Sequence, residues 1–104
     1  MGAFKTPKPG NREENSAAFY ARVCGRVQGV GFRYSTIHEA RRLGVSGWVR
    51  NTDDRDVEVW AEGSPEKLAQ FFAWLHRGPQ FARVDSVERE DREPQGYRGF
   101  DVED

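Results

Sequence analysis

The chain has 104 residues, 37% of them hydrophobic and 32% charged, a composition typical of one small globular domain with a modest core. Its formal net charge of -1 gives no argument for binding nucleic acid or an anionic membrane. The single cysteine, Cys24, excludes an internal disulfide and argues against a cysteine-built zinc site. No apolar run approaches the ~20 residues that span a bilayer, and no signal-peptide pattern is present, so we expect a cytoplasmic protein.

The first segment predicts a tail and a strand. Residues 1–16 are rich in charge, proline and glycine, so we expect a disordered tail over 1–16 and a domain over 17–104. Residues 18–24 alternate, which predicts a half-buried strand with Phe19 on its buried face. Cys24, at the end of this strand, is expected to be an inert packing residue.

A glycine-rich loop follows, with Gly25, Gly29 and Gly31 between the strand and a helix. A tight loop that opens onto a helix N-terminus directs unpaired N–H groups at one point, which suits an anion. Arg33 adds a planar guanidinium that matches phosphate geometry. Tyr34 stands where a dinucleotide fingerprint needs its third glycine, and no P-loop lysine occurs. The loop predicts an oxyanion cradle, most simply for phosphate; the competing interpretation is a glycine-rich turn beside a solvated arginine.

The spacing after the loop predicts a helix over 32–43, with Gly44 as its C-cap. His38 could serve as a general base, but no carboxylate partner is set by the sequence, and we expect a histidine on the flank of the helix. The residues expected to face the core are Phe32, Thr36, Ala40 and Leu43.

Two strands, 45–51 and 57–61, form a predicted hairpin, and Asn51 ends the first of them. In the second strand, Val57, Val59 and Ala61 should share one face, with Glu58 and Trp60 on the other.

The remaining elements are a helix and two strands. Ser64 and Pro65 are typical of a helix start, and Gly78-Pro79 of a helix end. A strand over 82–89 and a short edge strand around Phe100 follow. This order predicts an α+β fold, a ferredoxin-like split βαβ sandwich (βαββαβ), with an antiparallel sheet, two helices on one face and a short extra C-terminal strand.

Two motifs carry a family resemblance. Residues 25–33 read Gly-Arg-Val-Gln-Gly-Val-Gly-Phe-Arg, and residues 44–51 read Gly-Val-Ser-Gly-Trp-Val-Arg-Asn. They resemble, in order and spacing, the two signatures of the acylphosphatase family, and the similarity extends over roughly residues 18–102. One departure lies in the turn at residues 53–56, where family members often carry Asp-Gly; its conformation is left open.

The resemblance implies the same ferredoxin-like fold and hydrolysis of a carboxyl-phosphate anhydride to a carboxylate and inorganic phosphate. It implies that Arg33 binds phosphate and that Asn51 positions the attacking water. It also implies that the partners are a small-molecule acyl phosphate and inorganic phosphate. No nucleophile triad and no metal-ligand spacing are present, so we expect a metal-independent enzyme without a cofactor. A monomer is the default expectation, since no residue pattern sets the oligomeric state. The backbone N–H groups that match the cradle belong to Gln28, Gly29, Val30, Gly31, Phe32 and Arg33.

Two other functions share parts of this pattern. An RNA-binding module would interleave aromatic and basic residues on the central strands, but residues 57–63 carry glutamates there and only one aromatic, Trp60. A non-catalytic, regulatory phosphate-binding module would keep the loop and Arg33 but lack turnover; the presence of Asn51 argues against it. The physiological acyl phosphate, the oligomeric state and the role of the tail are left open.

Overall fold

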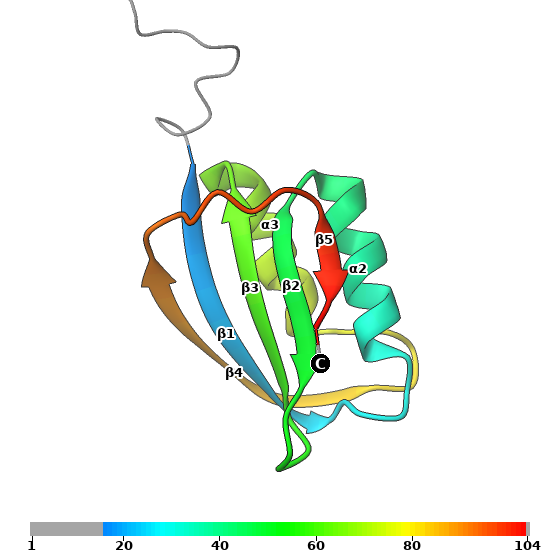
Figure 1. The fold of residues 1–104 in the computed structure, drawn as a ribbon. Helices are drawn as coiled ribbons and strands as arrows, with labels where there is room; N and C mark the ends of the chain where they lie inside the picture. The colour runs from blue at the N-terminus through cyan, green and yellow to red at the C-terminus, as the bar shows by residue number, and fades with distance from the viewer. Residues whose placement is uncertain (1–15, 104) are drawn as a thin grey trace, which may run out of the picture.

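The structure is a computed structural model that describes residues 16–103. Figure 1 shows both helices on one face of a single five-stranded sheet, which confirms the predicted ferredoxin-like architecture. The tail predicted over 1–16 lies outside the described residues except for Ser16, and its boundary stays a prediction. The elements in chain order are β1 (Ala17–Arg26), α2 (Phe32–Leu43), β2 (Ser46–Asn51), β3 (Val57–Gly63), α3 (Pro65–Leu75), β4 (Arg83–Arg92) and β5 (Phe100–Val102).

The strand order is β4-β1-β3-β2-β5, with β1 between β4 and β3. Strands β1 to β4 pair antiparallel, as predicted, but β5 pairs parallel with β2. The reason is the path of the chain after β4. The connection crosses the sheet at the end where β2 begins, so β5 enters from that same end (Figure 1). The sheet is therefore mixed at this one edge.

Helix α2 covers the predicted range, and α3 begins as predicted but ends at Leu75 with His76 as its C-cap, ahead of the predicted Gly78-Pro79 stop. The backbone N–H of Lys67 donates to the Ser64 side chain at the start of α3, and Pro65 follows directly. Gly44, with φ of 77°, caps the C-terminus of α2. The four residues expected on the core face of α2 are all buried. They pack with the inner face of the sheet and with α3, where Phe71 contacts Phe100 edge-on at 5.7 Å between ring centroids.

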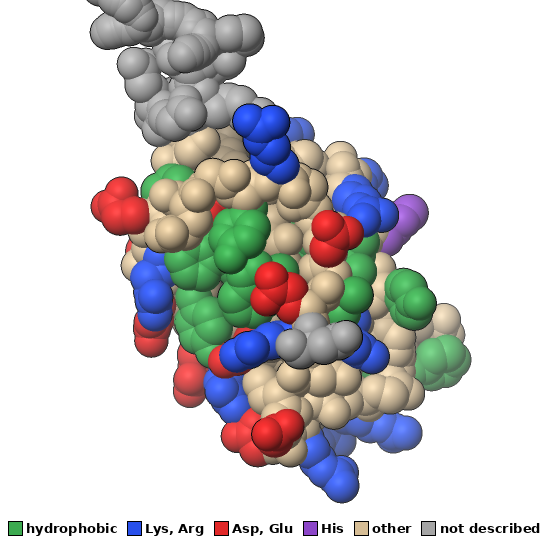
Figure 2. Space-filling model, viewed as in Figure 1, with side chains coloured by type: hydrophobic (Ala, Val, Ile, Leu, Met, Phe, Trp, Pro, Cys, Tyr) green, Lys and Arg blue, Asp and Glu red, His purple; other side chains and the backbone are tan. Residues whose placement is uncertain are grey.

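The face of the sheet opposite the helices, here called the open face, is covered in part by the chain itself. Trp60 was predicted to point this way, and it does, yet it is only 9% exposed. Hydrophobic side chains gather at the middle of this face in Figure 2, below the segment that crosses from β4 to β5. Tyr97 of that segment lies 6.3 Å from Trp60 between ring centroids. The crossing segment thus extends the buried surface beyond the two-layer core.

Glu62 anchors this crossing segment. It is 6% exposed, and its carboxylate accepts the indole N–H of Trp60 at 2.8 Å. It also accepts the backbone N–H groups of Gln95, Gly96 and Tyr97 at 2.5, 3.0 and 3.1 Å. A buried carboxylate needs several donors to offset the loss of water, and this one has them.

Replacing Glu62 by alanine should lower the free energy of unfolding by about 1–3 kcal/mol, because it leaves the donors around it without an acceptor. Urea denaturation followed by tryptophan fluorescence measures the change. The exposed Glu88, replaced by alanine in the same way, serves as control and should change stability by less than about 0.5 kcal/mol. Equal stabilities for the two variants would contradict the anchoring role.

Within residues 16–103, no helix is long and apolar enough to cross a membrane.

Candidate active site

The loop between β1 and α2 is shaped by glycines in the left-handed region. Gly29 and Gly31 have φ of 76° and 81°, a conformation that other residues rarely adopt. A Cβ atom at either position would meet nothing within 4 Å, so a side chain would not clash there. Glycine is favoured at these positions by the backbone conformation alone. Gly31 is also the N-cap residue of α2, and no side chain caps the helix there. The loop therefore presents bare backbone at the start of the helix.

The N–H groups of this loop have no acceptor in the described part of the chain. From Gln28 through Tyr34, no backbone N–H donates a hydrogen bond to a residue of segment 16–103. The helical ladder starts only with the Ser35 N–H, which donates to the Gly31 carbonyl at 3.0 Å. The first turn of α2 also holds no acidic residue. A helix N-terminus with several unpaired donors favours an anion in front of it.

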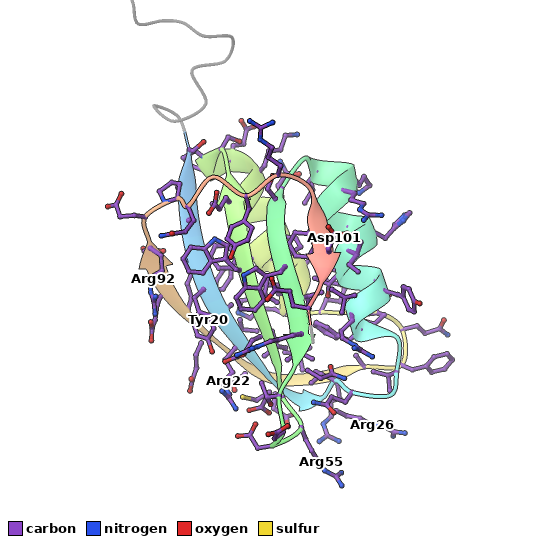
Figure 3. The ribbon with its side chains drawn as sticks, in the orientation of Figure 1. Tyr20, Arg22, Arg26, Arg55, Arg92 and Asp101 are labelled. Carbon is purple, nitrogen blue, oxygen red and sulfur yellow. The ribbon has the colours of Figure 1, made fainter. Side chains whose placement is uncertain are left out.

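Arg33 lies in the first turn of α2, next to these donors. Its side chain is exposed and makes no hydrogen bond or ion pair with any residue in the described range. Two other arginines, Arg26 at the end of β1 and Arg55 in the β2–β3 turn, lie at the same end of the sheet in Figure 3. A guanidinium without a protein partner can form a bidentate contact with a phosphate.

Asn51 ends β2, where its backbone pairs with Val57 of β3. Its Oδ1 is buried and has no hydrogen-bond partner, the one such side-chain atom among residues 16–103. Leaving a buried acceptor unpaired costs about 1–3 kcal/mol, so this oxygen favours a hydrogen bond from a donor outside the chain. A water molecule is a small donor that suits this position.

Gln28 brings the two halves of the site together. Its side-chain Nε2 donates to the carbonyls of Thr52 and Asp56 at 2.9 and 2.8 Å, so the loop is attached to the turn that follows Asn51. Helix α2, which carries Arg33, also packs on β2, which carries Asn51. The sequence motif predicts only a backbone role for Gln28. No spacing rule could have found its side-chain partners, because they are carbonyls 24 and 28 residues away.

The turn between β2 and β3, whose conformation the sequence left open, is well braced. Arg55 takes a left-handed φ of 78°, a conformation that glycine adopts more readily than other residues. The Thr52 hydroxyl accepts the Asp56 N–H at 2.9 Å and donates to Asp54 at 2.5 Å. Arg22 of β1 donates to Asp54 at 2.6 Å and to Asp56 at 2.8 Å. The Thr52 hydroxyl and the Arg22 charge hold the pKa of Asp54 below its usual range.

The other candidate groups lie elsewhere. His38 is exposed and lines a cavity of about 520 Å³ with Trp74 and Pro79, between the two helices. Burial raises the pKa of the half-buried Cys24 thiol, which disfavours the reactive thiolate. In the described part of the chain, no group of three or more His, Cys, Asp or Glu side chains could hold a metal ion.

Comparisons with known proteins support the same assignment. The acylphosphatase family model matches residues 19–102. An acylphosphatase of Thermococcus kodakarensis is 53% identical over 83 residues, which cover 80% of this chain and 91% of that protein. An acylphosphatase of a Nocardioides species is 46% identical over 95 residues, covering 91% and 96%. Among solved structures, an acylphosphatase from Coxiella burnetii superposes with a TM-score of 0.86 at 35% identity, covering 91% of this chain and 100% of that one.

Proposed function

This chain belongs to the acylphosphatase family, and from that premise we propose that it hydrolyses acyl phosphates between the β1–α2 loop and Asn51. The substrate is a small molecule in which a phosphate is joined to a carboxyl group. The products are a carboxylate and inorganic phosphate.

The loop and Arg33 hold the phosphoryl group. The N–H groups from Gln28 to Arg33, which donate to no described residue, are available to one anion, and the Arg33 guanidinium adds a permanent charge beside them. During transfer, charge spreads over the three equatorial phosphoryl oxygens. Donors already fixed by the backbone stabilise that charge without reorganising during the reaction.

Asn51 positions the nucleophile. A water that donates one hydrogen to the Oδ1 of Asn51 is held with a lone pair free to attack phosphorus. As the new P–O bond forms, the bond from phosphorus to the acyl oxygen breaks, and the carboxylate leaves with that electron pair. The proton of the water passes to a phosphoryl oxygen, so no side chain is needed as a general base. A carboxylate is a weak base and leaves without protonation.

The buried and unpartnered Oδ1 of Asn51, next to a loop of unpartnered N–H groups, is the observation that carries this mechanism. The direct test is hydrolysis of benzoyl phosphate by the purified protein in the presence of a chelator. We expect turnover with benzoate and inorganic phosphate released in equal amounts, at the same rate with and without chelator. Binding of phosphate without any turnover would instead indicate a non-catalytic phosphate-binding module.

We also propose that the protein acts as a monomer in the cytoplasm, without nucleic acid. In support, the loop, Arg33 and Asn51 all come from one chain, and the net charge of -1 provides no general attraction for a polyanion. Light scattering at the assay concentration measures the mass in solution. A dimer with unchanged activity per chain would contradict only the monomer proposal.

A further inference from the structure

The side chain of Gln28 has a role that its backbone N–H does not have. Both hydrogens of Nε2 are used, one for the Thr52 carbonyl at 2.9 Å and one for the Asp56 carbonyl at 2.8 Å. These two carbonyls belong to the two ends of the turn that connects Asn51 with Val57. One amide group therefore joins the proposed phosphate loop to the proposed water site.

The turn to which Gln28 donates its hydrogen bonds is also held by hydrogen bonds of its own. The Thr52 N–H donates to the Asp56 carbonyl at 2.9 Å, and the Asp56 N–H donates to the Thr52 hydroxyl at 2.9 Å, which closes the turn. Arg22 of β1 also holds the turn through its hydrogen bonds to Asp54 and Asp56. Because the turn cannot deform to follow the loop, any movement of the loop changes the distance between the loop and the turn.

The loop, by contrast, is held mainly by apolar packing, through Val30 against the core and the buried Val27 and Phe32 on either side of it. Its N–H groups from Gln28 to Tyr34 donate to no described residue, and Gly29 and Gly31 carry no side chain that could fix it. Among the hydrogen bonds of residues 16–103, the two from Gln28 are the ones that join the loop to the β2–β3 turn. Removing them would leave the distance between the bound phosphoryl group and the water on Asn51 to be set by side-chain packing alone.

We infer that Gln28 is a positioning residue, whose side-chain amide sets the distance between the phosphate loop and the water held by Asn51. This rests on the function proposed above. In-line attack requires the reacting atoms to be about 3–3.5 Å apart, and a misplacement of about 1 Å can cost about 10²-fold in rate. Phosphate binding itself depends on the loop N–H groups and Arg33, which the Gln28 side chain does not contact. The side chain should therefore act on turnover much more than on binding.

The test is to replace Gln28 by methionine, which has a similar length but no N–H donor. We expect kcat for benzoyl phosphate to fall about 10–100-fold, while the inhibition constant of inorganic phosphate changes less than about 3-fold. Replacing Gln28 by glutamate places a carboxylate against two carbonyl oxygens and should be at least as harmful. The exposed Gln70 of α3, replaced by methionine, is the matched control and should retain wild-type kcat.

A second measurement separates positioning from a general structural effect. In the Asn51→Ala background the water is no longer held, so Gln28→Met should then lower the remaining rate by less than about 2-fold. The same fold-loss in both backgrounds would overturn the inference, as would wild-type kcat in the Gln28→Met protein. A wild type without turnover overturns this inference together with the proposed function, whereas an active wild type equalled by Gln28→Met overturns the inference alone.

Discussion

Arg33→Ala should lower kcat/KM for benzoyl phosphate by about 10²–10³-fold, the effect of removing a major donor to the transition state. The arginine is exposed and has no partner in the described chain, so its removal leaves no buried charge and should keep the fold. The inhibition constant of inorganic phosphate should also rise, because the same guanidinium holds the ground-state phosphate. Steady-state hydrolysis measures kcat/KM, and inhibition by inorganic phosphate measures the inhibition constant; both are measured on variants that are shown to be folded.

Arg33→Lys sharpens this test. Lysine keeps the positive charge but replaces a planar fork by a single ammonium group, so most of the loss should remain. If lysine restored wild-type activity, charge alone would account for Arg33, and the bidentate contact would be refuted. The exposed Arg77, beyond the end of α3, provides a control for the loss of one surface charge: Arg77→Ala should retain wild-type kcat/KM.

Asn51→Ala should reduce kcat to a similar extent, about 10²-fold or more, while inorganic phosphate still binds with an inhibition constant within about 3-fold of the wild type. The reason is that Asn51 is proposed to hold the water and not the phosphoryl group. Its Oδ1 makes no hydrogen bond within residues 16–103, so its loss removes no internal contact of that atom. Thermal denaturation should accordingly show a stability equal to or above that of the wild type.

Asn51→Asp separates the water site from electrostatics. The aspartate retains an acceptor for water but adds a negative charge near the bound phosphate, so we expect phosphate binding to weaken and kcat to stay low. If the Asn51→Ala protein kept the wild-type kcat, the proposed role of Asn51 in holding the water would be wrong. An Asn51→Ala protein that lost phosphate binding as well would move Asn51 into the phosphate cradle.

Much of this fold was predictable because local patterns and the tertiary structure agree. The apolar spacing from Phe32 to Leu43 describes a helix with one buried face, and Ser64, Pro65 and Gly44 mark helix ends by conformations that are local to them. Arg33 and Asn51 could be singled out as candidates because two sequence motifs carry them, and their roles stay a prediction. The structure adds that their elements pack on each other.

The features that could not be predicted depend on contacts between distant segments. The parallel pairing of β5 follows from where the chain crosses the sheet, and local alternation does not encode that path. Glu62 has the strand position of a solvated glutamate, but residues more than 30 positions away bury it and bond to it. Gln28 belongs to the same class: its sequence context describes a loop, and only the fold identifies its two carbonyl acceptors.

The position of β1, between β4 and β3, has a consequence for how activity appears during folding. The β2–β3 hairpin joins neighbours in sequence, such as Asn51 and Val57, and can close early. Strand β1 pairs Ala18 with Glu62 on one side and with Arg92 on the other, so its ladders require the closure of long chain loops. The proposed phosphate loop begins where β1 ends, and among residues 16–103 its hydrogen bonds to the hairpin turn are those of the Gln28 side chain. Regain of hydrolysis on refolding should therefore coincide with completion of the whole sheet, and an early hairpin intermediate would be inactive.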